Sequence, residues 1–158
     1  MKPKKIGLLQ RKMSETNQFI SGEKELSKYA PMILDQLHHK KIWFVHGAMG
    51  SGKTSLIKAI VHTLKSQDLA SSPTFSIIQQ YSIPENPWKI KGIYHMDLYR
   101  LETLDQAINV AIEDHFRSAF LCILEWPELV RPILQTDEIA EINIEVLDKN
   151  QRSYTLKA

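Results

Sequence analysis

The chain has 158 residues, of which 43% are hydrophobic and 24% charged, and its formal net charge is +2. This length fits one domain with its own core, and the ordinary composition excludes a disordered chain or a disulfide-stapled mini-protein. The small positive charge does not indicate a dedicated nucleic-acid binder, and the single cysteine, Cys122, excludes a disulfide framework or a cysteine-rich metal site.

The N-terminal residues are basic and lack the apolar core of a secretory signal. We interpret residues 1–14 as a flexible, solvated tail rather than a phosphate-binding arm, and residues 15–158 as a single domain. No run of residues approaches the roughly 18 to 20 apolar residues that span a bilayer. Together with the unpaired cysteine, this predicts a cytoplasmic protein that does not contact membranes.

A helix and a buried strand are expected first. Ser21 is a plausible N-cap, and apolar residues then recur at helical spacing as far as Leu37, with Pro31 expected to kink or divide the helix. The continuous run IWFV at 42–45 predicts a strand buried on both faces. A second helical pattern follows at 56–64.

The rest of the chain predicts three more strands before a closing hairpin. Strands are expected at 76–83 and 90–98, paired as a hairpin, and a buried strand at 119–124. A helix is expected from about Thr103 and another opening at Pro127, and the chain should close with a hairpin of 139–147 and 153–156. Two doubly buried strands, each followed by a helix, predict a three-layer α/β sandwich of the P-loop class. Its sheet is mostly parallel, with antiparallel additions and a C-terminal hairpin.

The sequence GAMGSGKT between the first buried strand and its helix matches GxxxxGK[ST], the pattern of a phosphate-binding loop. Glycines allow the backbone N–H groups to approach phosphate oxygens, and the helix N-terminus adds a positive dipole end. Lys53 would reach the β and γ phosphates, and Thr54 would bind Mg²⁺. A chance match is disfavoured because the motif lies between a strand and a helix. The expected nucleotide contacts are Gly47, Ala48, Met49, Gly50, Ser51, Gly52, Lys53, Thr54 and Ser55.

Two acidic residues are candidates for catalysis and for holding Mg²⁺ with Thr54. Glu125 directly follows a buried strand, at the sheet edge where P-loop enzymes keep a metal-binding acid. Alternation places Asp97 on one face of its strand with Ile93 and His95. When Asp97 is considered on its own, a structural ion pair with Arg100 is as well supported as a role in the site.

The segment SSPTF at 71–75 lies where switch loops of nucleotide hydrolases occur, so Thr74 is a candidate sensor of the γ-phosphate. An ordinary turn is the slightly preferred interpretation, since serine and proline favour turns. The six histidines lack metal-ligand spacing and are interpreted as packing or surface residues.

Taken together, GAMGSGKT, SSPTF, IYHMDLYRL, IEDHF and ILEWPE closely resemble the TsaE family, from roughly Phe19 to Tyr154. The resemblance implies a Mg²⁺-dependent ATPase that works with the TsaB and TsaD proteins. The resemblance also implies that this ATPase supports threonylcarbamoyl modification of the adenosine at position 37 of tRNA. It implies that this protein contacts tRNA only indirectly, through the partner complex.

The same resemblance assigns residue roles. Lys53 and Thr54 match the phosphate and Mg²⁺ positions, Thr74 matches the switch threonine, and Trp126 matches a tryptophan close to the nucleotide. Asp97 and Glu125 match the essential acids of the family, so Lys53, Asp97 and Glu125 are the expected catalytic residues. The chain departs from the family at Ala111 and Ile112, where a glycine is usual, and at His115, where tyrosine is common.

Two rival functions are less well supported. A small-molecule P-loop kinase would use the same cradle, but it needs a lid and clamping arginines, and no arginine-rich loop is present. A GTPase-like switch is disfavoured because the chain has neither an NKxD nor a DxxG motif.

Overall fold

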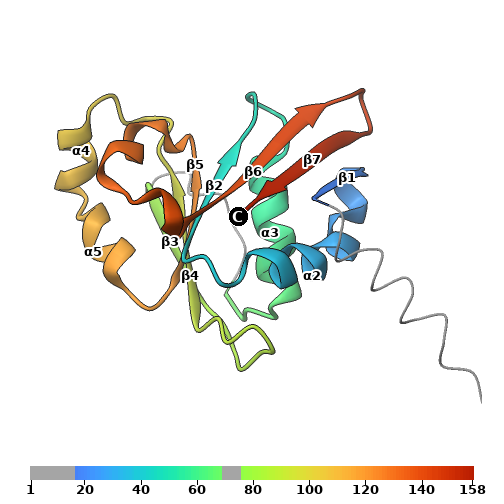
Figure 1. Cartoon of the computed structure of the whole chain (residues 1–158), viewed down its shortest axis with the longest axis horizontal. Coiled ribbons are helices and arrows are strands. Elements are labelled where there is room, and N and C mark those ends of the chain that lie inside the picture. The colour runs from blue at the N-terminus through green and yellow to red at the C-terminus, as the bar shows by residue number, and fades with distance from the viewer. Residues whose placement is uncertain (1–16, 69–75) are drawn as a thin grey trace, which may run out of the picture.

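The computed structural model describes residues 17–68 and 76–158, which form one mixed sheet with helices on both faces (Figure 1). The sheet has seven strands in the described residues, in the order β1-β7-β6-β2-β5-β4-β3. Their bounds are β1 Gln18–Ser21, β2 Ile42–His46, β3 Ile78–Ser82, β4 Gly92–Asp97, β5 Leu121–Glu125, β6 Ile139–Val146 and β7 Arg152–Lys157. The tail predicted over residues 1–14 and the candidate Thr74 lie outside the described residues.

The centre of the sheet is parallel, and both edges are antiparallel. Strands β6, β2, β5 and β4 pair in parallel, whereas β3 is antiparallel to β4, β7 to β6 and β1 to β7. The two predicted hairpins, β3–β4 and β6–β7, are therefore confirmed. Strands β2 and β5 are buried almost throughout, as continuous apolar runs predict. Because parallel strands end at one edge, β2, β4 and β5 all deliver their last residues to the same side of the sheet.

Alternating side chains divide the core between the two faces. Helices α2 (Leu26–Leu37) and α3 (Lys53–Thr63) pack on one face against residues such as Trp43 and Ile123. The other face, which includes Phe44 and Leu124, packs against α4 (Leu104–Asn109) and α5 (Ile112–Arg117). It also packs against 3₁₀ turns that follow β5. These turns are η2 Pro127–Leu129, η3 Arg131–Ile133 and η4 Thr136–Glu138. The three-layer α/β prediction is confirmed.

The first helix begins later than predicted. Ser21 is not its N-cap but the last residue of β1, an edge strand that pairs with β7, and a 3₁₀ turn, η1 (Glu23–Glu25), comes before Leu26. The strand is held by Phe19, whose ring stacks between those of Tyr29 and Tyr154. These contacts come from distant parts of the chain, so local periodicity did not indicate them.

Pro31 does not divide α2, which runs unbroken from Leu26 to Leu37. The proline is exposed, while its neighbours Ala30, Met32 and Ile33 are buried against the sheet. Packing of the apolar face thus outweighs the hydrogen bond that proline cannot make.

The predicted helix after Thr103 is in fact two. Thr103 caps α4 by accepting from the N–H of Gln106, but Ala111 takes a left-handed conformation (φ 54°) and separates α4 from α5. Pro127 opens only the short 3₁₀ turn η2 rather than an α-helix. In the described residues, no helix is both long and apolar enough to cross a bilayer.

Candidate active site

The predicted phosphate-binding loop connects the end of β2 to the start of α3. Gly50 and Gly52 have positive φ angles of 76° and 102°, a region that side chains disfavour, and Gly52 directly precedes the first residue of α3. A Cβ atom on either glycine would meet no atom within 4 Å. The loop is therefore open at these two glycines, next to the first turn of α3, whose N–H groups have no acceptor within the helix and could bind phosphate.

Lys53 lies in the loop with only 5% of its surface exposed. Its ammonium donates to the carbonyl oxygens of Gly47 at 2.8 Å and Ala48 at 3.0 Å, and it lies 4.4 Å from the ring centroid of Trp126. Burial lowers the pKa of Lys53, although the carboxylates of Glu125, Asp97 and Glu128 act in the opposite direction. The loop thus holds a positive charge where phosphate oxygens would be bound.

Glu125 is the centre of a buried polar cluster. Its Oε1 accepts from the Thr54 hydroxyl at 2.7 Å and lies 2.7 Å from His95 Nε2. Glu125 is 4% exposed and His95 is fully buried. Burial alone raises the pKa of Glu125, but the hydrogen bonds from His95 and Thr54, with the charges of His95 and Lys53, outweigh it and lower the pKa. The carboxylate is therefore kept ionised beside the hydroxyl of the loop.

Asp97 lies next to Glu125 at the same edge of the sheet. The two residues are direct partners in the parallel pairing of β4 with β5, and Asp97 Oδ1 accepts from the N–H of Tyr99 at 3.1 Å. The predicted face of β4 is confirmed, because Ile93 packs on the α2–α3 side and His95 meets Glu125 there. No ion pair between Asp97 and Arg100 is among those formed in residues 17–68 and 76–158.

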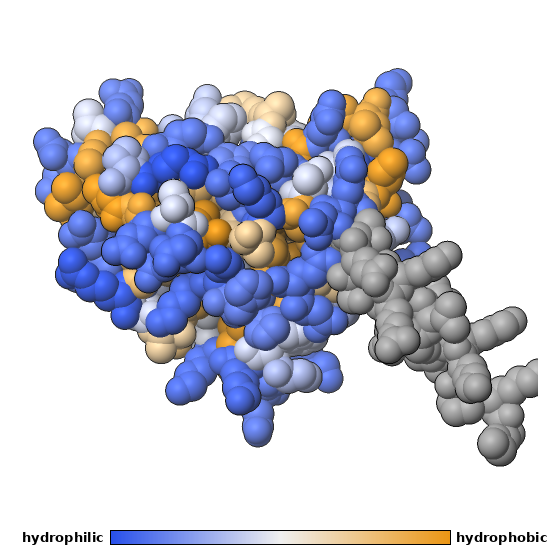
Figure 2. Space-filling view, viewed as in Figure 1, coloured by the Kyte–Doolittle hydropathy of each residue, from blue (hydrophilic) through white to orange (hydrophobic). Residues whose placement is uncertain are grey.

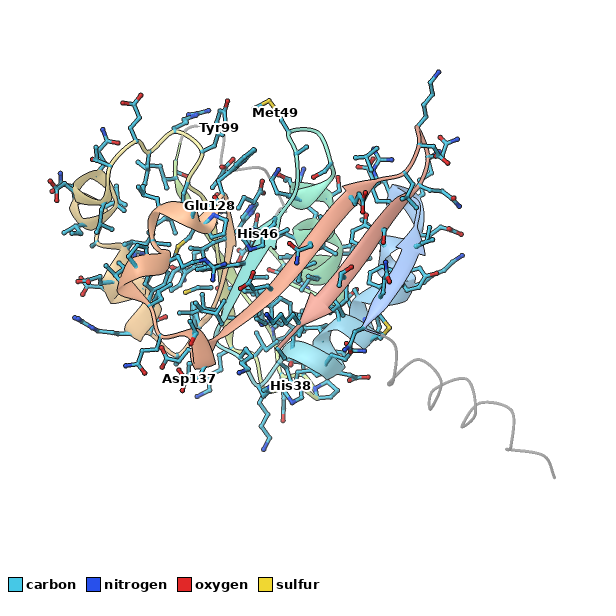
Figure 3. All side chains as sticks on the ribbon, turned by 45° about the horizontal axis from the view of Figure 1, so that its top comes forward. His38, His46, Met49, Tyr99, Glu128 and Asp137 are labelled. Atoms are coloured by element: carbon cyan, nitrogen blue, oxygen red, sulfur yellow. The ribbon has the colours of Figure 1, made fainter. Side chains whose placement is uncertain are left out.

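A second polar cluster lies at the end of β2, just before the loop. His46 is 3.3 Å from a carboxylate oxygen of Glu128 and 3.1 Å from one of Glu141, and Arg131 binds the other oxygen of Glu141 at 3.1 Å. Figure 3 shows His46 and Glu128 near one another, with Met49 and Tyr99 at the outer rim of the same edge. The cluster connects β2 and β6 to the turns that follow Trp126.

Met49, Tyr99 and Trp126 form the rim of the site. Met49 is 66% and Tyr99 56% exposed, and the rings of Tyr99 and Trp126 lie 5.1 Å apart. Trp126 has a positive φ of 56°, which is rare for a residue with a side chain and which turns the chain sharply away from the end of β5.

The donor atoms here suit Mg²⁺ bound together with a phosphate. Within the described ranges, no three His, Cys, Asp or Glu side chains are grouped to hold a metal by themselves. Mg²⁺, however, is usually held by one or two protein oxygens together with substrate phosphates. The Thr54 hydroxyl and the Glu125 carboxylate, already in contact beside the loop, fit that chemistry.

His95 was missed as a site residue, because the histidines were interpreted as packing or surface residues. The signal was present in the alternation of β4, which placed His95 on the same face as Asp97. Glu23 and Arg152 also lie at the site without having been predicted. Glu23 accepts from the Ser55 hydroxyl at 2.5 Å, and Arg152 donates to the Ser51 carbonyl at 3.3 Å.

Comparisons with known proteins agree with this architecture. The model of the family described as "Threonylcarbamoyl adenosine biosynthesis protein TsaE" matches residues 20–154. The chain is 31% identical over 142 residues to the tRNA threonylcarbamoyladenosine biosynthesis protein TsaE of Haemophilus influenzae, covering 86% of this chain and 85% of that protein. It is 30% identical over 114 residues to the protein of the same name from Bacillus subtilis, covering 72% and 67%.

A solved structure shows the same fold. The crystal structure of YdiB from Bacillus subtilis aligns with a TM-score of 0.65 and 23% sequence identity, covering 89% of this chain and 84% of that one. The sheet with a phosphate-binding loop between β2 and α3 is the arrangement of nucleotide-binding P-loop proteins.

Proposed function

The chain belongs to the TsaE family, and on that premise we propose that it is a Mg²⁺-dependent ATPase. In this proposal it supports threonylcarbamoyladenosine modification of tRNA position 37. The observation that carries the proposal is the contact of Thr54 with Glu125 beside Lys53, because it brings a hydroxyl, a carboxylate and an ammonium to one loop. Relatives named for threonylcarbamoyladenosine biosynthesis support the biological role.

The loop would bind the triphosphate. The residues from Gly47 to Ser55 form the cradle, and Lys53 would exchange its two loop carbonyls for phosphate oxygens. This exchange is favourable because a charged acceptor forms the stronger hydrogen bond with an ammonium group. Trp126, 4.4 Å from the ammonium, would border the same phosphates.

Two acids would complete the reaction centre. Mg²⁺ bound with the nucleotide would neutralise the charge of the phosphate oxygens, and Thr54, Asp97 and Glu125 are the residues that would hold it. Glu125, kept ionised by Thr54 and His95, is also the carboxylate that would orient water toward the phosphates. His95 fixes the orientation of Glu125.

We further propose that TsaB and TsaD are the partners of this protein, and that it contacts tRNA only through them. The formal charge of +2 is small for a protein that binds tRNA directly. Figure 2 shows one face, which is largely hydrophilic, with hydrophobic surface both near the β6–β7 hairpin and on the opposite side near α4.

The test is a phosphate-release assay with ATP, GTP and candidate acceptor metabolites, with and without TsaB and TsaD. We expect Mg²⁺-dependent release from ATP that rises when both partners are present. Transfer of phosphate to a metabolite would favour a small-molecule kinase instead, and no turnover of ATP in the complete mixture would refute the ATPase. A pull-down with nucleotide and Mg²⁺ asks whether TsaB and TsaD bind together.

A further inference from the structure

His46, the last residue of β2, contacts two carboxylates just before the phosphate-binding loop. Its Nδ1 lies 3.3 Å from Glu128 Oε1 on η2, its neighbour in Figure 3, and its Nε2 lies 3.1 Å from Glu141 Oε2 on β6. An ionised carboxylate only accepts hydrogen bonds, and a neutral imidazole carries a proton on only one nitrogen. Both contacts are therefore hydrogen bonds only when the ring is the doubly protonated imidazolium.

Arg131, on η3, is the second cation of this cluster. Its guanidinium donates to the other carboxylate oxygen of Glu141 at 3.1 Å, and it lies 5.0 Å from the ring centroid of Phe44. When His46 is protonated, two cations face two carboxylates, and their charges cancel. When His46 is neutral, the cluster carries one net negative charge.

This charge lies close to the ammonium that would bind phosphate. Burial lowers the pKa of Lys53, and the nearby carboxylates, that of Glu128 among them, act to raise it. The charge of Glu128 therefore acts on the Lys53 ammonium. A triphosphate bound to that ammonium would be repelled by a carboxylate without a cation beside it. Protonation of His46 thus favours phosphate binding.

Loss of the proton should release Glu128 rather than Glu141. The carboxylate of Glu141 is the closer of the two, and its side chain is 26% exposed, whereas that of Glu128 is 64% exposed. Water therefore competes less for the bond to Glu141, and the remaining proton stays on Nε2. Nδ1 then presents a lone pair to Glu128, and that contact is no longer a hydrogen bond.

Glu128 connects this change to the phosphate site. It lies in η2, which begins directly after Trp126, and the Trp126 ring is 4.4 Å from the Lys53 ammonium. The bond from His46 ties this turn to the last residue of β2, which directly precedes Gly47. The imidazolium therefore holds Trp126 and the loop in one arrangement around Lys53.

We propose that His46 is a positioning residue whose imidazolium form holds the turn after Trp126 against the phosphate-binding loop and strengthens phosphate binding. Loss of one ring proton opens this contact and weakens binding. The inference rests on the nucleotide site proposed above and adds to it a dependence on pH, because histidine changes its charge between about pH 5 and pH 8.

The first test measures the affinity of a non-hydrolysable ATP analogue with Mg²⁺, and of tripolyphosphate, by calorimetry at about pH 6 and about pH 8. In the wild type, the ratio of the two affinities should exceed that of His46→Gln roughly threefold, as for a partly exposed ion pair. His46→Lys, which keeps a cation at both pH values, should show the same small ratio but bind more tightly than His46→Gln. His62→Gln, a change of an exposed histidine on α3, is the matched control and should keep the wild-type ratio.

The outcomes separate this inference from the nucleotide site. An equal ratio in the wild type and in His46→Gln, or equal affinities of His46→Lys and His46→Gln, would overturn the role of His46 while leaving the nucleotide site intact. If the wild type bound neither ligand at either pH, the nucleotide site and the role of His46 would both be overturned.

The second test follows the wild type without ligand by nitrogen-15 NMR of its histidine rings and tryptophan indoles. His46→Gln and Trp126→Phe identify the two signals by their absence. Both ring nitrogens of His46 should have imidazolium shifts at about pH 6, and the Trp126 indole signal should move as His46 loses its proton. A neutral His46 ring at that pH, or a Trp126 signal that does not follow its titration, would overturn the proposal.

Discussion

The hydroxyl of Thr54 and a carboxylate oxygen of Glu125 are 2.7 Å apart, although 71 positions separate the two residues in the chain. Thr54 lies at the start of α3 and Glu125 at the end of β5, which is hydrogen-bonded to β2. The loop after β2 therefore delivers Thr54 directly to the end of the neighbouring strand. This parallel pairing builds the candidate reaction centre.

Lys53→Ala should weaken ATP binding by at least about tenfold, because it removes the ammonium that would contact the charged phosphate oxygens. Titration calorimetry measures the change. Lys58→Ala, which removes an ammonium from the same helix but away from the loop cavity, is the control and should bind ATP normally. Equal losses in the two variants would contradict the role of Lys53.

Glu125→Gln should slow ATP turnover by about a hundredfold or more, as expected when a positioned acid or base is lost. Binding of ATP should change much less than turnover, since the amide oxygen can still accept from Thr54, and Thr54 and Asp97 remain to hold Mg²⁺. Glutamine is preferred to alanine because alanine would leave the buried His95 without its partner, at a cost of about 1–3 kcal/mol. Steady-state turnover and calorimetry on the same preparation separate the two effects, and an equal loss of both would refute the assignment.

Trp126 should report nucleotide binding through its fluorescence. Its ring lies 4.4 Å from the Lys53 ammonium, which must move when phosphates displace its loop contacts. Trp43 is fully buried, and Trp88 is bonded to Asp35. We expect ATP to change the emission of the wild type and to leave that of Trp126→Phe nearly unchanged. A full signal in this variant would show that another tryptophan responds.

Cys122 should be unreactive in the folded protein. It is 1% exposed, and burial raises the pKa of its thiol from 9.0 to about 12. A thiol reagent at pH 8 should therefore modify it only at the rate of unfolding. Rapid labelling under native conditions, followed by mass spectrometry, would contradict this burial.

The same thiol makes a pH-dependent contribution to stability. Because its folded pKa is raised, its contribution is fully present below about pH 9 and is lost as the pH rises toward about 12, where the unfolded chain releases the proton more readily. The free energy of unfolding should fall more steeply with pH in the wild type than in Cys122→Ala over this interval. Parallel slopes in urea denaturation would argue against the raised pKa.

Local patterns were enough to predict the elements that depend on neighbours in sequence. The apolar run before Gly47, the glycine-rich loop and the helix containing Lys53 and Thr54 are contiguous, so spacing alone indicated a phosphate-binding loop. Alternation along β4 likewise placed His95 and Asp97 on one face. The sheet that carries them was predicted because doubly buried strands followed by helices have few stable arrangements.

Only the tertiary structure decided which distant side chains meet. The partners in His95–Glu125, Glu23–Ser55 and Arg152–Ser51 lie 30, 32 and 101 positions apart, and no local periodicity encodes such contacts. They follow from the strand order, which sets β5 beside both β2 and β4 and closes β1 onto β7. Propensity and periodicity act over a few residues, whereas strand pairing depends on burying the whole core at once. The sequence alone therefore determined the loop. The side chains that contact the loop from distant segments were decided only by the folded chain.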